Sequence, residues 1–421
     1  MSLHLEPPQR HSQSARSVLA IVLAGGQGQR LVPLTNYIAK PATRFGGSYR
    51  MIDFTLSSCL NSGLRRIYLL TQFASSSLTR HVRKGWAPLL SDDLGEFVDL
   101  IPPQKVFADR WYAGTADAVF QNIFLLQQER PDHVILLSGD HAYKMDYSLM
   151  LQQHQATAAD LTIACLALPL QQCTQLGVVT AAADGRIEQF VEKPAQPSPL
   201  PDSPELALVS MAVYIWRTEA LVRHLIADAR RDTSHDFGKD IIPPMVAAGE
   251  KVYAYRFRSA GRSDSDYWRD IGTLSSYWQA HADLLSREPE LDLYDPTWPI
   301  YTYRPVAPPA KITCGAEGHG AWVADSIISA GCLIADAAVS QSVLSPGVTI
   351  RDACVEQSVL MDNVTVAPGA HLRKVVVAEG VDIPAGMRIG HDAERDARRF
   401  VVTADGITVV PSRIVLDEQE A

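Results

Sequence analysis

The residues best suited to binding a charged ligand lie in one short stretch near the N-terminus. Gly25, Gly26 and Gly28 are followed by Arg30, and Lys40 comes ten residues after that arginine, directly before a proline. Glycines allow a sharp turn and let backbone N–H groups approach a bulky anion closely. Together with the two cationic side chains, they predict a cradle for a polyphosphate.

This stretch matches neither of the common phosphate-binding loops. Leu31 stands where the G-x-G-x-x-G pattern requires a glycine, and no Gly-Lys-Ser/Thr is present. An ordinary corner between a strand and a loop therefore explains the glycines alone equally well. The pairing with Arg30 and Lys40 favours the phosphate-binding interpretation.

Two aspartates are candidate ligands for a divalent cation. Asp140 follows an apolar run at 134–137 and a glycine, and Asp270 lies within the segment 267–273. Mg²⁺ prefers hard oxygen ligands and usually takes one or two carboxylates together with substrate phosphates. Each aspartate could equally cap a helix or a turn. A metal site is expected only if the fold brings the two side chains together.

Further segments carry groups suited to a sugar phosphate. Lys193 precedes a proline and could meet a phosphate, while Glu192 and Asp236 could accept hydrogen bonds from hydroxyl groups. Trp111 or Trp268 could form an apolar wall beside the sugar. Taken singly, each of these residues suits an ordinary surface or core position as well.

Alternating strands and helices must position these groups. Apolar runs predict buried strands at 18–24, 66–71, 134–137, 161–168 and 209–216, with helices at 75–83, 116–128 and 147–156. This alternation predicts a Rossmann-like, mostly parallel α/β sheet with ligands at the carboxyl ends of its strands.

The chain changes character after a proline-rich stretch. Residues 288–310 contain six prolines and predict a linker, and four segments then align at 326–341, 342–357, 358–374 and 375–390. A repeat of nearly 16 residues, built from three short units, forms one triangular coil of a parallel β-helix. The aliphatic residues expected to stack inside it are Ile328, Ile334, Val339, Leu344, Ile350, Val355, Leu360, Val366, Leu372, Val377, Ile383 and Ile389. We therefore expect a disordered tail at 1–16, a catalytic domain at 17–287, the linker, and a β-helix domain at 311–421.

Composition narrows the class of protein. A chain of 421 residues favours two domains, and its net charge of −9 argues against a general binder of nucleic acids or membrane surfaces. Its six cysteines form no C-x-x-C motif, as expected of free thiols in a reducing cytoplasm. The first sixteen residues lack the apolar core of a secretory signal, and no apolar run reaches the roughly 18 residues of a membrane span.

A set of motifs in a fixed order identifies a family. LAGGQGQRL, AKPATRFGG, FTLSSCLNSGLRRIYLLTQ, WYAGTADAV, SGDHAYKMDY, FVEKPA, HDFGKD and YWRDIGT occur in this order before the repeats. Together with left-handed β-helix repeats, they strongly resemble the bacterial glucose-1-phosphate adenylyltransferase (ADP-glucose pyrophosphorylase) family, from about residue 18 to residue 400. The glycine turn is shared by all sugar-1-phosphate nucleotidylyltransferases, whereas the combination of WYAGTADAV, HDFGKD and YWRDIGT is more specific.

The resemblance implies the transfer of an adenylyl group from ATP to α-D-glucose 1-phosphate, giving ADP-glucose and diphosphate, with Mg²⁺. It implies the committed step toward bacterial glycogen, and a homotetramer with contacts through the β-helix. The catalytic residues implied are Arg30, Lys40 and Asp140; the nucleotide-binding residues are Gly25, Gly26, Gly28, Arg30, Gln72 and Gly114; the metal ligands are Asp140 and Asp270. The residues implied for glucose 1-phosphate are Tyr112, Glu192, Lys193, Ser210, Asp236 and Trp268.

The expected regulatory surface departs from the family pattern. Members activated by fructose 1,6-bisphosphate commonly carry basic residues where this chain has Tyr37 and Ile38. Arg44 and Arg50 remain, so Tyr37, Arg44 and Arg50 are the candidate effector site. Since each charged hydrogen bond contributes about 1.5–3 kcal/mol, the lost cations predict weak or altered control by a small phosphate or carboxylate.

Three alternative functions stay open at this point. The chain could be a nucleotidylyltransferase with another base preference, or a regulatory subunit of the same family. The second is disfavoured because all the catalytic charges are present. Parallel β-helices also occur in acyltransferases, whose sites usually need a histidine on a coil. His371, expected at a corner, is the one histidine within the four repeats.

Overall fold

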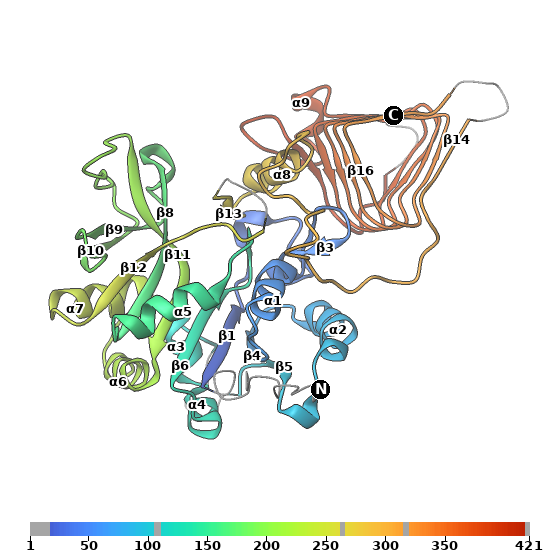
Figure 1. The fold of residues 1–421 in the computed structure, drawn as a ribbon. Coiled ribbons are helices and arrows are strands. Elements are labelled where there is room, and N and C mark those ends of the chain that lie inside the picture. The colour runs from blue at the N-terminus through green and yellow to red at the C-terminus, as the bar shows by residue number, and fades with distance from the viewer. Residues whose placement is uncertain (1–16, 105–110, 262–265, 315–319, 417–421) are drawn as a thin grey trace, which may run out of the picture.

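The computed structural model describes residues 17–104, 111–261, 266–314 and 320–416. It comprises a sheet-based domain and a triangular coil of strands, connected by a long strap (Figure 1). The tail expected at 1–16 lies outside the described residues. Within the part of the chain that is described, no helix combines the length and apolar character needed to cross a bilayer.

The first domain is built on a nine-stranded sheet. Its parallel half contains, in spatial order, β6 (His133–Ser138), β1 (Val18–Ala24), β4 (Arg66–Thr71) and β5 (Phe97–Ile101). The other half is mainly antiparallel and contains β11 (Leu206–Arg217), β8 (Leu161–Pro169), β9 (Gly177–Ala181), β10 (Ile187–Glu192) and β12 (Val252–Arg256). The α/β class and its parallel sheet are confirmed, and the antiparallel half adds to what the sequence predicted.

Helices cover both faces of this sheet, which explains why β1 is apolar at every position. Ala20 and Val22 face one core, while Leu19 and Ile21 face the other. The first core is covered by α1 (Met51–Asn61), α2 (Ser76–Gly85) and α5 (Tyr147–Ala156). The second is covered by α3 (Thr115–Phe120), α4 (Ile123–Glu129), α6 (Thr218–Asp228) and α7 (Ile242–Ala247).

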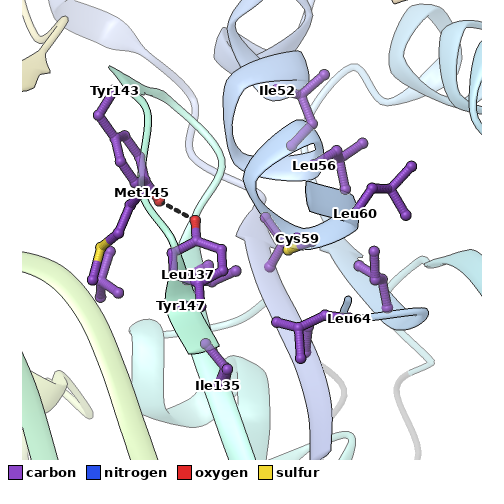
Figure 2. Close-up of a cluster of buried hydrophobic side chains, with 14 of the residues drawn as sticks. Ile52, Leu56, Cys59, Leu60, Leu64, Ile135, Leu137, Tyr143, Met145 and Tyr147 are labelled. Carbon is purple, nitrogen blue, oxygen red and sulfur yellow. Dashed lines mark hydrogen bonds between the residues drawn. The ribbon is translucent and has the colours of Figure 1, made fainter. Parts of the chain in front are cut away.

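Figure 2 shows how α1 packs on the first core. Ile52, Leu56 and Leu60, spaced four residues apart on one side of α1, lie among the apolar residues of this core. Beside them the hydroxyl groups of Tyr143 and Tyr147 lie 2.6 Å apart, so each phenol has a polar partner inside the apolar cluster. This packing fixes the segment that follows β6.

The single helix predicted at 116–128 is wrong, because the chain breaks it between α3 and α4. Gln121 and Asn122 lie at the break and are both buried. Their side-chain amides donate to Asp117 and to the carbonyl of Ala118, each at 2.8 Å. Such local side-chain bonds compete with the helical backbone ladder.

The second domain is a parallel β-helix with three flat faces, and its predicted repeat is confirmed. Its first face contains β14 (Lys311–Thr313), β17 (Leu333–Ala335), β20 (Thr349–Arg351), β23 (Thr365–Val366) and β26 (Asp382–Ile383). Its second contains β15 (Trp322–Ala324), β18 (Ala338–Ser340), β21 (Cys354–Glu356), β24 (His371–Arg373) and β27 (Arg388–Ile389). Its third contains β16 (Ile327–Ile328), β19 (Val343–Leu344), β22 (Val359–Leu360), β25 (Val375–Val377), β29 (Thr408–Val410) and β28 (Val401–Val402). Every aliphatic residue of the predicted stack except Ile328 is buried, whereas His371 lies in a strand and not at a corner.

A mixed apolar and ionic contact joins the two domains. Phe45 of β2 (Arg44–Phe45) belongs to the same buried cluster as Val359 of the β-helix and residues of α8 (Leu274–Asp283). Arg44 forms an ion pair with Asp362, and both side chains are largely buried. The short strand β3 (Tyr49–Arg50) pairs with β2, and α9 (Ala393–Asp396) follows the last coil.

Candidate active site

The glycine-rich turn follows β1 and packs closely against Lys40. Gly28 has a φ of +63°, which favours glycine, and a Cβ there would lie 3.1 Å from the Cβ of Lys40. A Cβ on Gly25 would lie 3.0 Å from the Cβ of Gln72. Gly26 is exposed and has nothing close to its Cβ position, so this side of the turn is open to a ligand.

Lys40, Asp140 and Asp270 converge on one point. The Nζ atom of Lys40 lies 2.6 Å from Oδ2 of Asp140 and 3.3 Å from Oδ1 of Asp270. The hydroxyl group of Ser138 also donates to Asp140. Three segments far apart in the sequence therefore place one cation and two carboxylates in direct contact.

Strand pairing explains why the two aspartates meet. The strand β13 (Trp268–Asp270) pairs antiparallel with β7 (His141–Tyr143), and Asp270 lies opposite the residue that follows Asp140. Neither aspartate caps a helix: α8 has Thr273 as its N-cap, and β7 directly follows Asp140. The helix-capping interpretation of both aspartates is therefore wrong.

Burial and mutual attraction act in opposite directions on these charges. Burial alone lowers the pKa of Lys40, but Asp140 and Asp270 outweigh it and leave that pKa raised. Burial alone raises the pKa of Asp140, but Lys40 and then His141 outweigh it and hold that pKa well below its usual range. At neutral pH, Lys40 is protonated and Asp140 is ionised.

The donor set suits a hard divalent cation. Asp140 and Asp270 present oxygen atoms to the same point, where Lys40 balances their charge. Among the described residues, no group of three or more His, Cys, Asp or Glu side chains could hold a metal by itself. A metal here would therefore depend on oxygen atoms of a phosphate ligand to complete its coordination, as is usual for Mg²⁺.

A cavity of 330 Å³ opens beside this charged group. Of the residues predicted from the sequence, those that line it are Gly25, Gly26, Arg30, Lys40, Asp140, Glu192, Lys193, Ser210, Asp236, Trp268 and Asp270. Burial, with Asp236 next, raises the pKa of Glu192. Lys193 is half-exposed and has a free approach to an anion, with its Nζ 3.7 Å from Glu192 Oε1.

A second cavity of 350 Å³ also borders the glycine turn. Gln72, Tyr112 and Gly114 line it, together with Gly25 and Gly26. Of the residues predicted for glucose 1-phosphate, Tyr112 alone is absent from the lining of the first cavity, and it shares the second cavity with Asp236. Its hydroxyl group accepts a hydrogen bond from Asn122 at 3.0 Å. Gly28 lines neither cavity and acts on the shape of the turn.

Sequence reasoning missed Tyr214, which lines the first cavity and lies 3.4 Å from the hydroxyl group of Ser210. Thr115, within the WYAGTADAV motif, lines both cavities. Ser210 is presented by an irregularity in β11, where Ala212 adopts a φ of +54°. No glycine marks this bulge, so the sequence carried no signal for it.

The three candidate effector residues lie outside both cavities. Tyr37 is exposed and its ring stacks with the guanidinium group of Arg413 at 4.1 Å. Arg44 is engaged by Asp362 and by the carbonyl of Ser48, and Arg50 donates to the carbonyl of Ala42. Both arginines thus already have oxygen partners within the chain.

Each domain matches a known protein family. A family model described as nucleotidyl transferase matches residues 19–287, and one described as a GlmU-like C-terminal hexapeptide matches residues 308–410. A protein of Albidiferax ferrireducens named glucose-1-phosphate adenylyltransferase is 48% identical over 408 residues, which is 95% of this chain and 96% of that protein. Proteins of the same name from Shewanella amazonensis (46% over 407 residues, 96% of each chain) and Methylococcus capsulatus (44% over 402 residues, 95% of this chain and 94% of that protein) are also similar.

Proposed function

The chain belongs to the glucose-1-phosphate adenylyltransferase family, and from this we propose how its cleft joins ATP to glucose 1-phosphate. The nucleotide occupies the second cavity, its phosphates cross the glycine turn, and the sugar phosphate occupies the first cavity. The observation that carries this proposal is the meeting of Lys40, Asp140 and Asp270 in the first cavity, which shares Gly25 and Gly26 of the glycine turn with the second.

The reaction needs positioning and charge more than it needs a base. A phosphate oxygen of glucose 1-phosphate is already an anion and attacks the α-phosphorus of ATP, displacing diphosphate. Lys193 holds the sugar phosphate, Glu192 and Asp236 accept hydrogen bonds from sugar hydroxyl groups, and the indole of Trp268 forms an apolar wall. Arg30 and Lys40 offset the negative charge that develops on the transferred and leaving phosphates.

Mg²⁺ is the metal we propose for Asp140 and Asp270. When bound, it would supply positive charge to the phosphate oxygens at the reacting phosphorus. Lys40 then remains beside both carboxylates and limits the repulsion between them. The preference for Mg²⁺ over Mn²⁺ or Ca²⁺ is checked by comparing turnover with each cation at equal free concentration.

The decisive experiment is steady-state release of diphosphate by the purified chain with ATP and glucose 1-phosphate. Diphosphate and ADP-glucose in equal amounts are the expected products, with lower efficiency for UTP, GTP or dTTP. A chain that is inactive alone but activates a catalytic relative would instead be a regulatory subunit. A higher rate with another nucleotide would change the assigned base.

We also propose weak or altered allosteric control. The support is the placement of the candidate effector residues: Tyr37 brings no charge, and Arg44 and Arg50 are occupied by oxygen atoms of the chain. Scanning the rate against glycolytic metabolites tests this. Strong activation by micromolar fructose 1,6-bisphosphate would contradict it.

Assembly and location complete the proposal. We propose a homotetramer assembled through the β-helix, whose first two coils expose Ile312, Trp322 and Leu333. Sedimentation of the purified chain tests this oligomeric state.

We further propose a cytoplasmic role in glycogen synthesis. The free thiols of all six cysteines support the reducing compartment, and glycogen content after deletion of the gene tests the pathway.

A further inference from the structure

The two cavities of the cleft share the glycine turn and a second junction, away from that turn. Thr115 and Asp236 line both cavities. The hydroxyl group of Thr115 donates to Oδ2 of Asp236 at 3.1 Å and accepts the backbone N–H of Phe237 at 3.1 Å. The backbone N–H of Ala116 donates to the carbonyl of His235 at 2.8 Å. The start of α3 is thus bonded directly to the segment that carries Asp236.

This contact leaves no space between the two segments. A Cβ at Gly114 would lie 2.3 Å from the carbonyl oxygens of both Ser234 and His235. No side chain fits at that distance, so the position requires glycine whatever its own conformation. Any movement of residues 234–236 is therefore transmitted to the turn that lines the nucleotide cavity.

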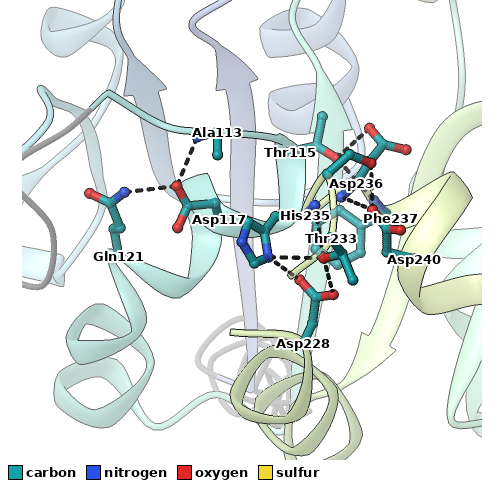
Figure 3. A network of polar contacts seen from close by, with 11 residues as sticks. Ala113, Thr115, Asp117, Gln121, Asp228, Thr233, His235, Asp236, Phe237 and Asp240 are labelled. Carbon is teal, nitrogen blue, oxygen red and sulfur yellow. Dashed lines mark hydrogen bonds and ion pairs between the residues drawn. The ribbon is translucent and has the colours of Figure 1, made fainter. Parts of the chain in front are cut away.

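His235 has an unusual backbone conformation at this junction. Its φ is +53°, and its side chain is buried. A non-glycine residue in the left-handed region is strained, and it persists only where its surroundings determine it. Here the side chain provides that constraint, because Nδ1 of His235 lies 2.7 Å from Oδ2 of the buried Asp228 (Figure 3).

Asp228 is in turn fixed by a second contact. The hydroxyl group of Thr233 donates to its Oδ1 atom at 2.8 Å, so both carboxylate oxygens have partners (Figure 3). Asp228 ends α6, which packs on the second core of the sheet. The pair thereby ties the junction to a rigid element, although neither Asp228 nor His235 lines a cavity.

We propose that the hydrogen-bonded pair of Asp228 and His235 is a positioning device that sets the geometry of both substrate pockets at once. His235 acts through its own carbonyl, which fixes the nucleotide-side turn, and through the adjacent Asp236, which faces the sugar pocket. One buried pair outside the cleft thus controls affinity for both substrates. This inference rests on the proposed assignment of the two cavities.

The test measures each substrate separately by equilibrium titration, first on the unaltered chain. His235→Ala removes the constraint and should weaken binding of ATP and of glucose 1-phosphate together, each roughly tenfold, or about 1.4 kcal/mol. His235→Asn should retain most of both affinities, because asparagine tolerates the left-handed region and its amide N–H can reach Asp228. A structural role alone would not separate these two variants in this way.

His154→Ala is the matched control. His154 is also buried in the first domain, with Nδ1 2.8 Å from the hydroxyl group of Thr162, and it lines neither cavity. This variant should lose stability and keep both affinities. If His235→Ala fails to fold, Asp228→Asn keeps the volume of the side chain and should show the same paired loss.

Three results would overturn the inference: unchanged affinities in His235→Ala, a loss confined to one substrate, or an equal loss in His154→Ala. The double variant Asp228→Asn with His235→Ala should be no worse than His235→Ala alone, since both break one contact. If the unaltered chain binds neither substrate, the proposed function fails instead.

Discussion

The β-helix and the cleft assemble their key residues in opposite ways. In the β-helix, stacked residues are separated by one coil, as Ile334 and Ile350 are, and each coil repeats the role of the last. In the cleft, Asp270 contacts Lys40 from 230 positions away. A repeated local pattern builds the first region, whereas the topology of the whole domain builds the second.

The two regions also differ in what they bury. The interior of the β-helix is an aliphatic stack. Its contribution to the free energy of folding scales with the apolar area removed from water. The cleft gathers a lysine and two carboxylates that would each be costly to bury alone. Substitutions in the β-helix should therefore reduce stability with little effect on catalysis, and substitutions in the cleft should do the reverse.

The largest effect is expected for Asp140→Ala. It removes a proposed metal ligand and the nearest anionic partner of Lys40, so kcat should fall roughly a thousandfold, within the usual range for loss of an electrostatic contact to the transition state. Diphosphate release at saturating substrates and Mg²⁺ measures it. Asp146→Ala, which removes only the N-cap of α5, should cost about 1 kcal/mol of stability and leave kcat intact. Near-normal turnover of Asp140→Ala would disprove the metal role.

Ile350→Ala tests the role of the β-helix interior. The Ile350 side chain is fully buried in the stack, so its truncation should destabilise the β-helix by about 2–5 kcal/mol. Urea unfolding followed by circular dichroism measures this, and kcat at low temperature should stay unchanged. The neighbouring Arg351 points outward and is exposed, so Arg351→Ala serves as the control. A large fall in kcat for Ile350→Ala without loss of stability would contradict the division of roles.

Lys193→Ala should affect one substrate more than the reaction step. Loss of a charged hydrogen bond to the sugar phosphate, about 1.5–3 kcal/mol, should raise the KM for glucose 1-phosphate roughly 10- to 150-fold. The KM for ATP and the stability should change little, since the Lys193 side chain is half-exposed. Lys251→Ala, at an exposed position outside both cavities, is the control. A fall in kcat with unchanged KM would assign Lys193 to the chemical step instead.

The same comparison explains what the sequence could predict. Strands such as β1 and β4, and the stack of the β-helix, follow from local patterns of apolar residues, so their positions were confirmed. The antiparallel half of the sheet was not predicted. An apolar run such as that of β11 indicates a buried strand, but it does not show whether that strand runs parallel or antiparallel to its neighbours. The break between α3 and α4 depends on side-chain bonds that no periodicity reveals.

The site was predicted as a set of candidates and not as an arrangement. Asp140 and Asp270 were chosen by residue type, but their meeting depends on β7 and β13, two strands too short to show a pattern. The bulge that presents Ser210 contains no glycine. The role of Asp228 requires knowing which helix ends beside His235, and only the folded chain shows that.

The smallest effect at neutral pH should come from His281, which is buried in α8. Its Nε2 accepts the N–H of Gly46, in the loop between β2 and β3, and burial lowers its pKa to about 4. The unfolded chain, with a histidine pKa near 6.5, binds more protons between these values, so stability should fall as the pH drops from about 6.5 toward 4. His281→Gln should weaken this dependence, as urea midpoints at about pH 7.5 and about pH 5 would show. His154, whose pKa burial lowers to about 3, adds a slope of the same sign within the first domain, so some dependence should persist. An identical drop in both proteins would show that protonation of His281 does not contribute to the pH dependence of stability.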